Sequence, residues 1–431
     1  MSKWIESPLA ELANIVSGGT PSRDVPGYWG GEIPWVTPTD ITACRTNYLE
    51  QTENTISKQG LLGSSTKLLP AGAILLTSRA SIGLSKIARI PVSTNQGFKS
   101  LIPKQGIDGT FLFYQTQRLR GAFERFAAGS TFLEINKKDT ERILLPHPTD
   151  PVEQKKIATI LNCIDTAIEK TEALIAKYQQ IKAGLMHDLF TRGVLPNGQL
   201  RPPREQAPEL YHETEVGWIS KDWQPVSLRD LVGSGNIING PFGSDLLTSE
   251  LKTEGVPVLY VQDIKPGLFS RISRAHVTDQ KANELAFCNV RQGDVLVAKV
   301  GDPPCDTCVY EQDQRAVVTQ DVIRIRPTTN VDSLYLASML NSPFGRKAVK
   351  RISIEGTRER VSLTEFKGLT FPIAPTDEQV LIAQRMSAVH STIASETAKL
   401  GKLTRQKRGL MHDLLTGAVP VNVEAPEAVD G

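Results

Sequence analysis

The stretch KAGLMHDLFTRG, residues 182–193, returns almost unchanged as KRGLMHDLLTG at residues 407–417, 225 positions later. The copy extends upstream, where EQKKIATIL from Glu153 matches EQVLIAQRM from Glu378 at the same offset. Self-similarity at a fixed offset is the signature of a repeated structural unit. The sequence therefore predicts a fold with an internal two-fold repeat.

Each copy carries apolar residues at alternating spacings of four and three, which is the heptad pattern of a helix that pairs with another helix. Each helix of about 38 residues would be roughly 55 Å long at about 1.5 Å per residue. The predicted seams consist of Ile157, Leu161, Ile164, Ile168, Ile175, Leu185 and Leu189 in the first helix, and of Ile382, Met386, Ile393, Leu400, Leu403, Leu410 and Leu414 in the second.

The polar interruptions of the two seams indicate how the helices run. Thr171 and Lys182 in the first copy correspond to Glu396 and Lys407 in the second. A parallel pair would place the two lysines side by side, whereas an antiparallel pair separates them. We therefore expect an antiparallel coiled coil related by a pseudo-two-fold axis. The alternative is two amphipathic helices, each packed on its own domain.

Segments of roughly 150 residues precede each helix and repeat one another more loosely. AILLT from Ala73 and DVLVAK from Asp294 have the pattern of buried strands, while TFLFYQTQRLRG from Thr110 and SLYLASMLN from Ser333 have helical periodicity. The expected fold is thus α+β. Its predicted parts are mixed α and β domains at residues 1–150 and 218–376, long helices at 151–192 and 377–417, a linker rich in Pro and Gly at 193–217, and a disordered tail at 418–431.

Composition excludes several classes of protein. With 40% hydrophobic and 22% charged residues, the chain has the balance of a folded protein. No apolar run has the length of a membrane span, and the first residues lack the pattern of a signal peptide, so we expect a cytoplasmic protein. The five cysteines are scattered and odd in number, which does not favour disulfides. A net charge of +2 does not by itself indicate DNA binding.

The usual catalytic motifs are missing from the sequence. It contains no phosphate-binding glycine loop, no G-x-G-x-x-G after a strand, no H-E-x-x-H and no G-x-S-x-G. His187 and His412 lie in the repeated helix ends, where scaffold or docking roles fit better than catalysis. Cys305 and Cys308 form a lone C-x-x-C without a second ligand pair, so a turn that closes a strand pair is the better interpretation than a metal site. We expect no catalytic residue and no metal.

Polar loop residues recur at matching places in the two domains, and they have the chemistry that contacts DNA. Gly-rich loops with hydroxyl and arginine side chains suit phosphates, while Asn, Gln and Arg can pair with base edges. The candidates in the first domain are Ser17, Gly19, Thr20, Ser22, Arg23, Thr77, Ser78, Arg79, Thr94, Asn95, Gln96 and Lys99. Those in the second domain are Asn239, Ser244, Lys299, Thr319, Gln320, Arg358 and Arg360, with Asp321 beside them.

The stretch AAGSTFLEINKKDTERILLPHPTDPVEQKKIATIL, residues 127–161, resembles the junction between a target-recognition domain and a conserved helix in the specificity subunits of type I restriction-modification enzymes. SGGTPS, GEIPWVTPTDIT, STNQGFKSLIP and GWISKDWQPVSLRDL are also similar to pieces of that family. The resemblance covers nearly the whole chain. The second domain departs from it more, with EGTRERVSLTEF in place of AGSTFLEINKKD.

The resemblance implies a non-catalytic subunit that recognises a bipartite, asymmetric double-stranded DNA target, with one half read by each domain and the gap set by the paired helices. It also implies docking of two methyltransferase subunits and of restriction subunits. The chain itself would bind no cofactor, since S-adenosylmethionine, ATP and Mg²⁺ belong to the partner subunits.

Two other functions remain open on the sequence alone. The Asp302-Pro303-Pro304-Cys305 segment has some similarity to the Asp-Pro-Pro-aromatic loop of amino-methyltransferases, so a stand-alone S-adenosylmethionine-dependent methyltransferase is one alternative. Its aromatic residue is replaced by Cys305, and no cofactor loop precedes it. A coiled-coil protein adaptor that binds no nucleic acid is the other alternative.

Overall fold

The computed structural model describes residues 3–79, 81–127, 133–241, 243–354, 356 and 358–422, with the side chain of residue 244 left out. These residues form two compact units. Unit 1 contains the described residues up to 173 and those from 397 onward, and unit 2 contains those from 174 to 396. Each unit combines small β-sheets with helices, so the predicted α+β class is confirmed.

Unit 1 holds a five-stranded sheet in the order β2-β9-β6-β7-β4 and a three-stranded sheet in the order β5-β3-β8. Strand β6 lies inside AILLT and is buried on both faces, as the apolar run predicts. A separate antiparallel pair joins β1 to β10. The strands are β1 (Trp4–Pro8), β2 (Ala13–Ser17), β3 (Trp29–Val36), β4 (Tyr48–Leu49), β5 (Asn54–Ile56), β6 (Ile74–Leu76), β7 (Ser85–Ala88), β8 (Ser93–Thr94), β9 (Lys99–Pro103) and β10 (Leu144–Pro148).

The short helices of unit 1 cover these sheets. Asp108 caps α4 by accepting a hydrogen bond from the backbone of Phe111, and α4 then buries Phe111, Phe113 and Tyr114 in the core of the unit. The helices are α1 (Leu9–Leu12), α2 (Pro38–Ala43), α3 (Lys58–Leu62), α4 (Gly109–Arg118), α5 (Arg120–Phe126) and α6 (Lys137–Arg142).

Unit 2 repeats this plan with two four-stranded sheets, β14-β24-β20-β22 and β18-β15-β23-β19, and a three-stranded sheet, β21-β26-β25. Strand β20 lies inside DVLVAK, as predicted. The strands are β11 (Tyr211–Thr214), β12 (Gly217–Ser220), β13 (Gln224–Ser227), β14 (Ile237–Asn239), β15 (Val256–Leu259), β16 (Ile264–Lys265), β17 (Leu268–Phe269), β18 (His276–Val277), β19 (Asn289–Val290), β20 (Val295–Ala298), β21 (Val300–Gly301), β22 (Thr307–Val309), β23 (Ala316–Val318), β24 (Val322–Ile325), β25 (Ser353–Ile354), β26 (Glu359–Val361) and β27 (Thr370–Ile373).

The helices of unit 2 also follow the repeat. Asp332 caps α10 through the backbone of Tyr335, as Asp108 caps α4 in unit 1. One hydrophobic core of the unit is formed around α10 and the sheet that contains β20, and a second core is formed around α9 and the sheet that contains β15 and β23. The helices are α8 (Leu228–Val232), α9 (Asp279–Glu284), α10 (Ser333–Asn341), α11 (Pro343–Lys350) and α12 (Leu363–Gly368).

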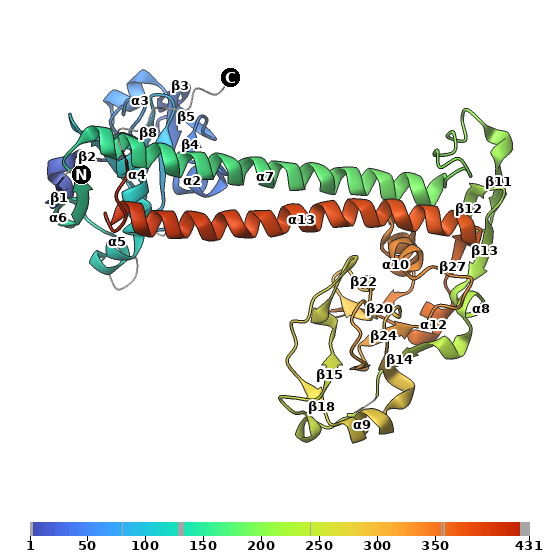
Figure 1. Cartoon of the computed structure of the whole chain (residues 1–431). Helices are drawn as coiled ribbons and strands as arrows, with labels where there is room; N and C mark the ends of the chain where they lie inside the picture. Colours follow the sequence, from blue (N-terminus) through green and yellow to red (C-terminus); the bar gives the residue numbers. More distant parts are fainter. Residues whose placement is uncertain are drawn as a thin grey trace. The chain divides into compact units, whose positions relative to one another are not determined.

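The two long helices are α7 (Pro151–Thr191) and α13 (Thr376–Leu415), and they pack together (Figure 1). In unit 1 the beginning of α7, with Ile157 and Leu161, shares a core with Leu414 near the end of α13. In unit 2 Leu189 near the end of α7 shares a core with Ile382 near the beginning of α13. The helices are therefore antiparallel, as predicted. Of the remaining seam residues Met386 is buried, and Ile164, Ile168, Ile175, Leu185, Ile393, Leu400, Leu403 and Leu410 are partly buried.

A glycine just after each long helix ends it through a left-handed backbone. Gly193 has a φ of 72° and Gly417 a φ of 73°. A side chain at Gly193 would overlap Trp223, and one at Gly417 would overlap Trp4. The end of α7 therefore packs against Trp223 and the end of α13 against Trp4. This close packing explains why glycine is required at both positions.

The predicted linker, residues 193–217, is folded into unit 2. Val194 and Arg201 are buried, and strands β11 and β12 pair across its end. The Arg201 guanidinium contacts Glu378 on α13, which holds the segment against the helix. A composition rich in Pro and Gly therefore marks an irregular but ordered segment here. Of the predicted tail, residues 418–422 form neither helix nor strand, and residues 423–431 lie outside the described part.

All five cysteines lie in the described part of the chain, and all five are free thiols. Within the described ranges no helix is both long enough and apolar enough to span a membrane.

Candidate nucleic-acid interface

Three loops of unit 1 meet at the ends of its strands. We name them loop A (residues 17–23), loop B (77–79) and loop C (94–97). Loop A is joined to loop C by a backbone hydrogen bond from Gly19 N to Thr94 O of 2.9 Å, and loop B is joined to loop C by one of 2.7 Å from the backbone of residue 78 to the carbonyl of residue 97. The structure therefore brings together the three loops that carry most candidates of the first domain.

The exposed part of this surface is polar and includes two arginines, Arg23 and Arg79. The Thr20 hydroxyl donates to the Gln96 side chain, which ties loop A to loop C a second time. The Arg23 guanidinium lies 6.0 Å from the ring centre of Trp29, within the range of a cation–π contact. The exposed candidates are Ser17, Thr20, Ser22, Arg23, Arg79 and Gln96, and Asn95 is partly exposed.

Other candidates of the first domain are buried and satisfied inside the protein. Thr77 Oγ1 donates to the Ser81 carbonyl at 2.5 Å and accepts from the Leu84 backbone at 3.1 Å. The buried candidates are Gly19, Thr77, Ser78, Thr94 and Lys99. Because their polar groups are needed to hold the loops, these residues shape the surface from within the protein.

Glu134 is a member of this site that the sequence reasoning missed. Its carboxylate pairs with Arg79 at 2.8 Å and with the buried Lys99 ammonium at 3.3 Å. Burial opposes ionisation of Glu134, but the hydrogen bonds from Arg79 and Lys99 outweigh it, so the pKa of Glu134 lies below its usual value. The carboxylate thereby fixes the direction of Arg79 at the edge of loop B.

Unit 2 assembles its loops in the same way. We name them loop A′ (residues 239–241), loop B′ (298–300) and loop C′ (318–321). Residue 240 of loop A′ donates to the carbonyl of Thr319 at 3.1 Å, and Lys299 of loop B′ donates from its backbone to the carbonyl of residue 321 at 2.8 Å. Strands β15 and β23 run parallel beneath loop C′, as β3 and β8 do beneath loop C.

The candidates of the second domain differ in exposure. Asn239 is buried, and its amide donates to the Gln320 carbonyl at 3.4 Å. Lys299, Thr319 and Asp321 are partly exposed, and Gln320, Arg358 and Arg360 are exposed. The side chain of Ser244 lies outside the described residues.

The two surfaces differ in charge at matched positions. The backbone of Ile135 donates to Ser78 at 3.1 Å in unit 1, and the backbone of Val361 donates to Lys299 at 3.3 Å in unit 2. Glu134 and Arg360, the residues just before these donors, therefore occupy equivalent places. Glu134 in unit 1 is thus replaced by Arg360 in unit 2, and Ser78 by Lys299. Two residues after Glu134 and after Arg360 stands the residue that caps the next helix, Asn136 in unit 1 and Ser362 in unit 2. Aligning these two caps in the sequence would have identified Glu134 as the counterpart of Arg360.

Cys305 lies in the segment between β20 and its antiparallel partner β22, and Cys308 lies within β22. This agrees with the predicted turn that closes a strand pair. Burial raises the pKa of each of these thiols to about 12, so both stay protonated at neutral pH. Among the residues that the structure describes, no cluster of His, Cys, Asp and Glu has the arrangement of a metal site. His187 and His412 are exposed on the surfaces of α7 and α13.

Comparison with known proteins places these features in one family. The family model described as type I restriction modification DNA specificity domain matches residues 1–180 and 220–405. The MjaIX specificity subunit of Methanocaldococcus jannaschii is 32% identical over 240 residues, which cover 55% of this chain and 54% of that protein. The matched region thus spans about half of that relative. The MjaVIII specificity subunit of the same organism is 24% identical over 321 residues, covering 73% of this chain and 71% of that protein.

A solved structure shares the fold. The S subunit of a type I restriction-modification system from M. genitalium superposes with a TM-score of 0.60 over 96% of both chains, at 15% sequence identity. The family model covers both repeats, and each repeat contributes one domain and one long helix. This chain therefore belongs to the family of type I restriction-modification DNA specificity subunits.

Proposed function

We propose that the chain is the non-catalytic DNA-reading subunit of a type I restriction-modification complex, and that each unit reads one half of a bipartite, asymmetric DNA target. The observation that carries the proposal is the pair of matched surfaces. Loops A to C and loops A′ to C′ are assembled by similar backbone hydrogen bonds but present different side chains. Two related surfaces of different chemistry suit a target whose halves differ in sequence.

The exposed residues divide by chemistry into two roles. Ser17, Ser22 and Arg23 in unit 1 suit contacts to phosphates, which position a protein on DNA without reading its sequence. Arg79 and Gln96 in unit 1, with Gln320 in unit 2, suit the edges of guanine and adenine. Lys299, Arg358 and Arg360 supply positive charge to the second surface, and we assign them to phosphates or to guanine.

The paired helices supply the second half of the proposal. We assign to α7 and α13 the docking of two methyltransferase subunits and the setting of the gap between the two half-sites, with restriction subunits joining the complex. S-adenosylmethionine, ATP and Mg²⁺ would be bound by those partners in the cytoplasm. A solved structure that describes complex assembly of a type I restriction-modification system has a similar fold, with a TM-score of 0.54, and is consistent with such docking.

Band-shift titration of the chain with its methyltransferase partner, on fragments of genomic DNA, tests the DNA-reading role. We expect retained complexes whose affinity falls steeply with salt, because each neutralised phosphate contributes a slope of about −0.9 in log K against log salt. Absence of any retained DNA would favour the protein adaptor. Binding of S-adenosylmethionine by the isolated chain would favour the stand-alone methyltransferase, whereas we expect no binding.

A further inference from the structure

The inner faces of α7 and α13 carry a polar cluster in unit 1. The Asp165 carboxylate accepts hydrogen bonds from Tyr114 Oη at 2.8 Å and from Asn47 Nδ2 at 2.6 Å. It also pairs with the Lys407 ammonium at 2.6 Å. Asp165 is 6% exposed, so this buried carboxylate is balanced by one cation and two neutral donors.

The internal repeat places an equivalent cluster in unit 2, where a histidine takes the place of the acid. Asp165 corresponds to His390 and Lys407 to Lys182 at the offset of 225 residues. Tyr114 is the sixth residue after the cap of α4, and Ser338 is the sixth after the cap of α10. An acid is thus replaced by a histidine and a phenol by a small hydroxyl, while the lysine is retained.

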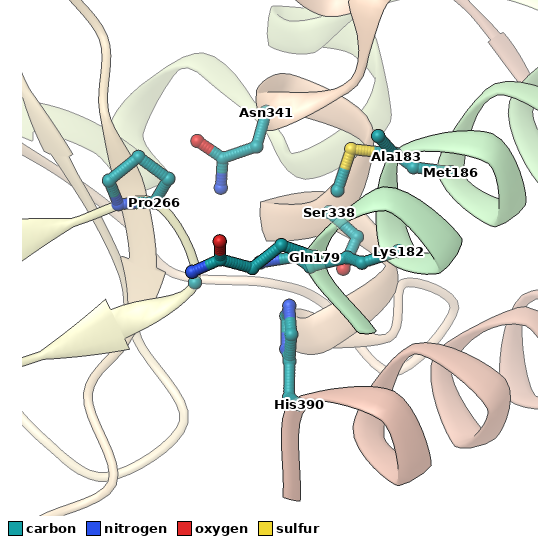
Figure 2. A pocket seen from close by; sticks show the side chains of 9 residues that line it. Gln179, Lys182, Ala183, Met186, Pro266, Ser338, Asn341 and His390 are labelled. Carbon is teal, nitrogen blue, oxygen red and sulfur yellow. The ribbon is translucent and has the colours of Figure 1, made fainter. Parts of the chain in front are cut away.

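The smaller side chains leave a cavity of about 220 Å³ between α7, α10, α13 and the turn at Gly267. Figure 2 shows Gln179, Lys182, Ser338, Asn341 and His390 around it. Neither Asp nor Glu is among the residues that line it. The remaining lining residues are Ala183, Met186, Pro266 and Gly267.

Polar atoms in this cavity lack protein partners. Ser338 is 2% exposed, and its hydroxyl has no hydrogen-bond partner in the described part of the chain. The same holds for the buried His390 Nε2. Burial, followed by repulsion from Lys182, lowers the pKa of His390 to about 4, so the ring is neutral at pH 7. Burial also lowers the pKa of Lys182 below its usual value.

We propose that unit 2 contains a binding site for a small oxyanion, formed by Lys182, Ser338 and His390. The ammonium and the hydroxyl are hydrogen-bond donors, and the imidazole donates in the tautomer that carries its proton on Nε2. A carboxylate or phosphate oxygen in the cavity would take the place that the Asp165 carboxylate fills in unit 1. The Asn341 amide is already paired with Thr307 and Ala337, so it forms a wall and not a ligand. This site is independent of the DNA-reading role.

Isothermal titration of the full chain with inorganic phosphate and, separately, with acetate tests the site. We expect millimolar binding of at least one of them, and the comparison tells whether a phosphate or a carboxylate is preferred. Lys182→Met should weaken binding by about tenfold or more, because a charge-assisted hydrogen bond contributes roughly that factor. Lys177→Met, at an exposed position of the same helix, is the matched control and should leave binding unchanged.

His390→Asp provides a second, independent variant. It rebuilds the acid of unit 1 beside Lys182, so it should abolish anion binding and raise the thermal midpoint of the chain. The circular dichroism of each variant reports whether it is folded. The proposal is overturned if neither anion binds the native chain, or if binding persists unchanged in both Lys182→Met and His390→Asp. Because no DNA is present, these outcomes leave the DNA-reading proposal unaffected.

Discussion

Replacing Glu378 with alanine is expected to lower the free energy of unfolding of unit 2 by about 3 kcal/mol, at the lower end of the cost of breaking a buried ion pair, because Arg201 keeps a second partner in Asp222. Glu378 is 6% exposed and pairs with Arg201, which is 3% exposed. Its carboxylate also accepts from Trp223 Nε1 at 3.0 Å and from the Val194 backbone at 2.7 Å. The change therefore removes the buried partner of the Arg201 guanidinium, which keeps the exposed Asp222 carboxylate at 3.1 Å, and it leaves two further donors without their acceptor.

Urea denaturation followed by tryptophan fluorescence and by amide hydrogen exchange of unit 2 measures this effect. Asp377→Ala is the matched control, since Asp377 is the exposed neighbour of Glu378 in the first turn of α13. We expect it to change stability by less than about 0.5 kcal/mol. A loss below about 1 kcal/mol for Glu378→Ala would show that the ion pair does not hold the segment after α7 in place.

Reversing the charge of both Arg358 and Arg360 to glutamate is expected to weaken DNA binding by the complex by about 100-fold or more at low salt. Both side chains are exposed beside loop B′, where Arg360 replaces the acid of unit 1. Two phosphate contacts would be lost and two repulsions gained. The neutral pair Arg358→Gln with Arg360→Gln should reduce the slope of log K against log salt by about 2 if both contact phosphates.

Fluorescence anisotropy of labelled target DNA at several salt concentrations measures both quantities. Arg291→Gln is the control, because Arg291 is exposed and precedes β20 at the end opposite to loop B′. Equal affinities for the native and doubly reversed chains would remove these arginines from the DNA surface. A loss confined to particular base sequences would instead assign them to base reading.

Much of the fold was accessible from the sequence because it depends on local periodicity and on repetition. The heptad seams predicted α7 and α13 and their antiparallel pairing, and the buried runs predicted β6 and β20. The packing of residues 193–217 against α13 could not be predicted from the sequence. It depends on Arg201 meeting Glu378, 177 residues away, and neither residue carries a local signal of that pairing.

The sequence indicated the loops that the structure brings together, but it did not indicate which of their side chains are exposed. Polar residues that support a loop, such as Thr77, look the same in a sequence as those that face solvent, such as Thr20. Glu134 was missed because an acid is not expected on a surface that is proposed to face DNA, although it orients Arg79. The exchange of Asp165 for His390 was visible in the repeat, but the cavity it leaves requires the structure.

Methylome sequencing of cells that express the chain with its methyltransferase subunits tests the central proposal most directly. The native chain is compared with one that carries one extra heptad after Thr171 in α7 and another after Glu396 in α13. Each heptad adds roughly 10 Å of helix, or about 3 base pairs. We predict a split motif methylated at adenine, whose two half-sequences stay unchanged while the gap between them grows. A continuous motif, or an unchanged gap in a folded and active variant, would contradict the proposal.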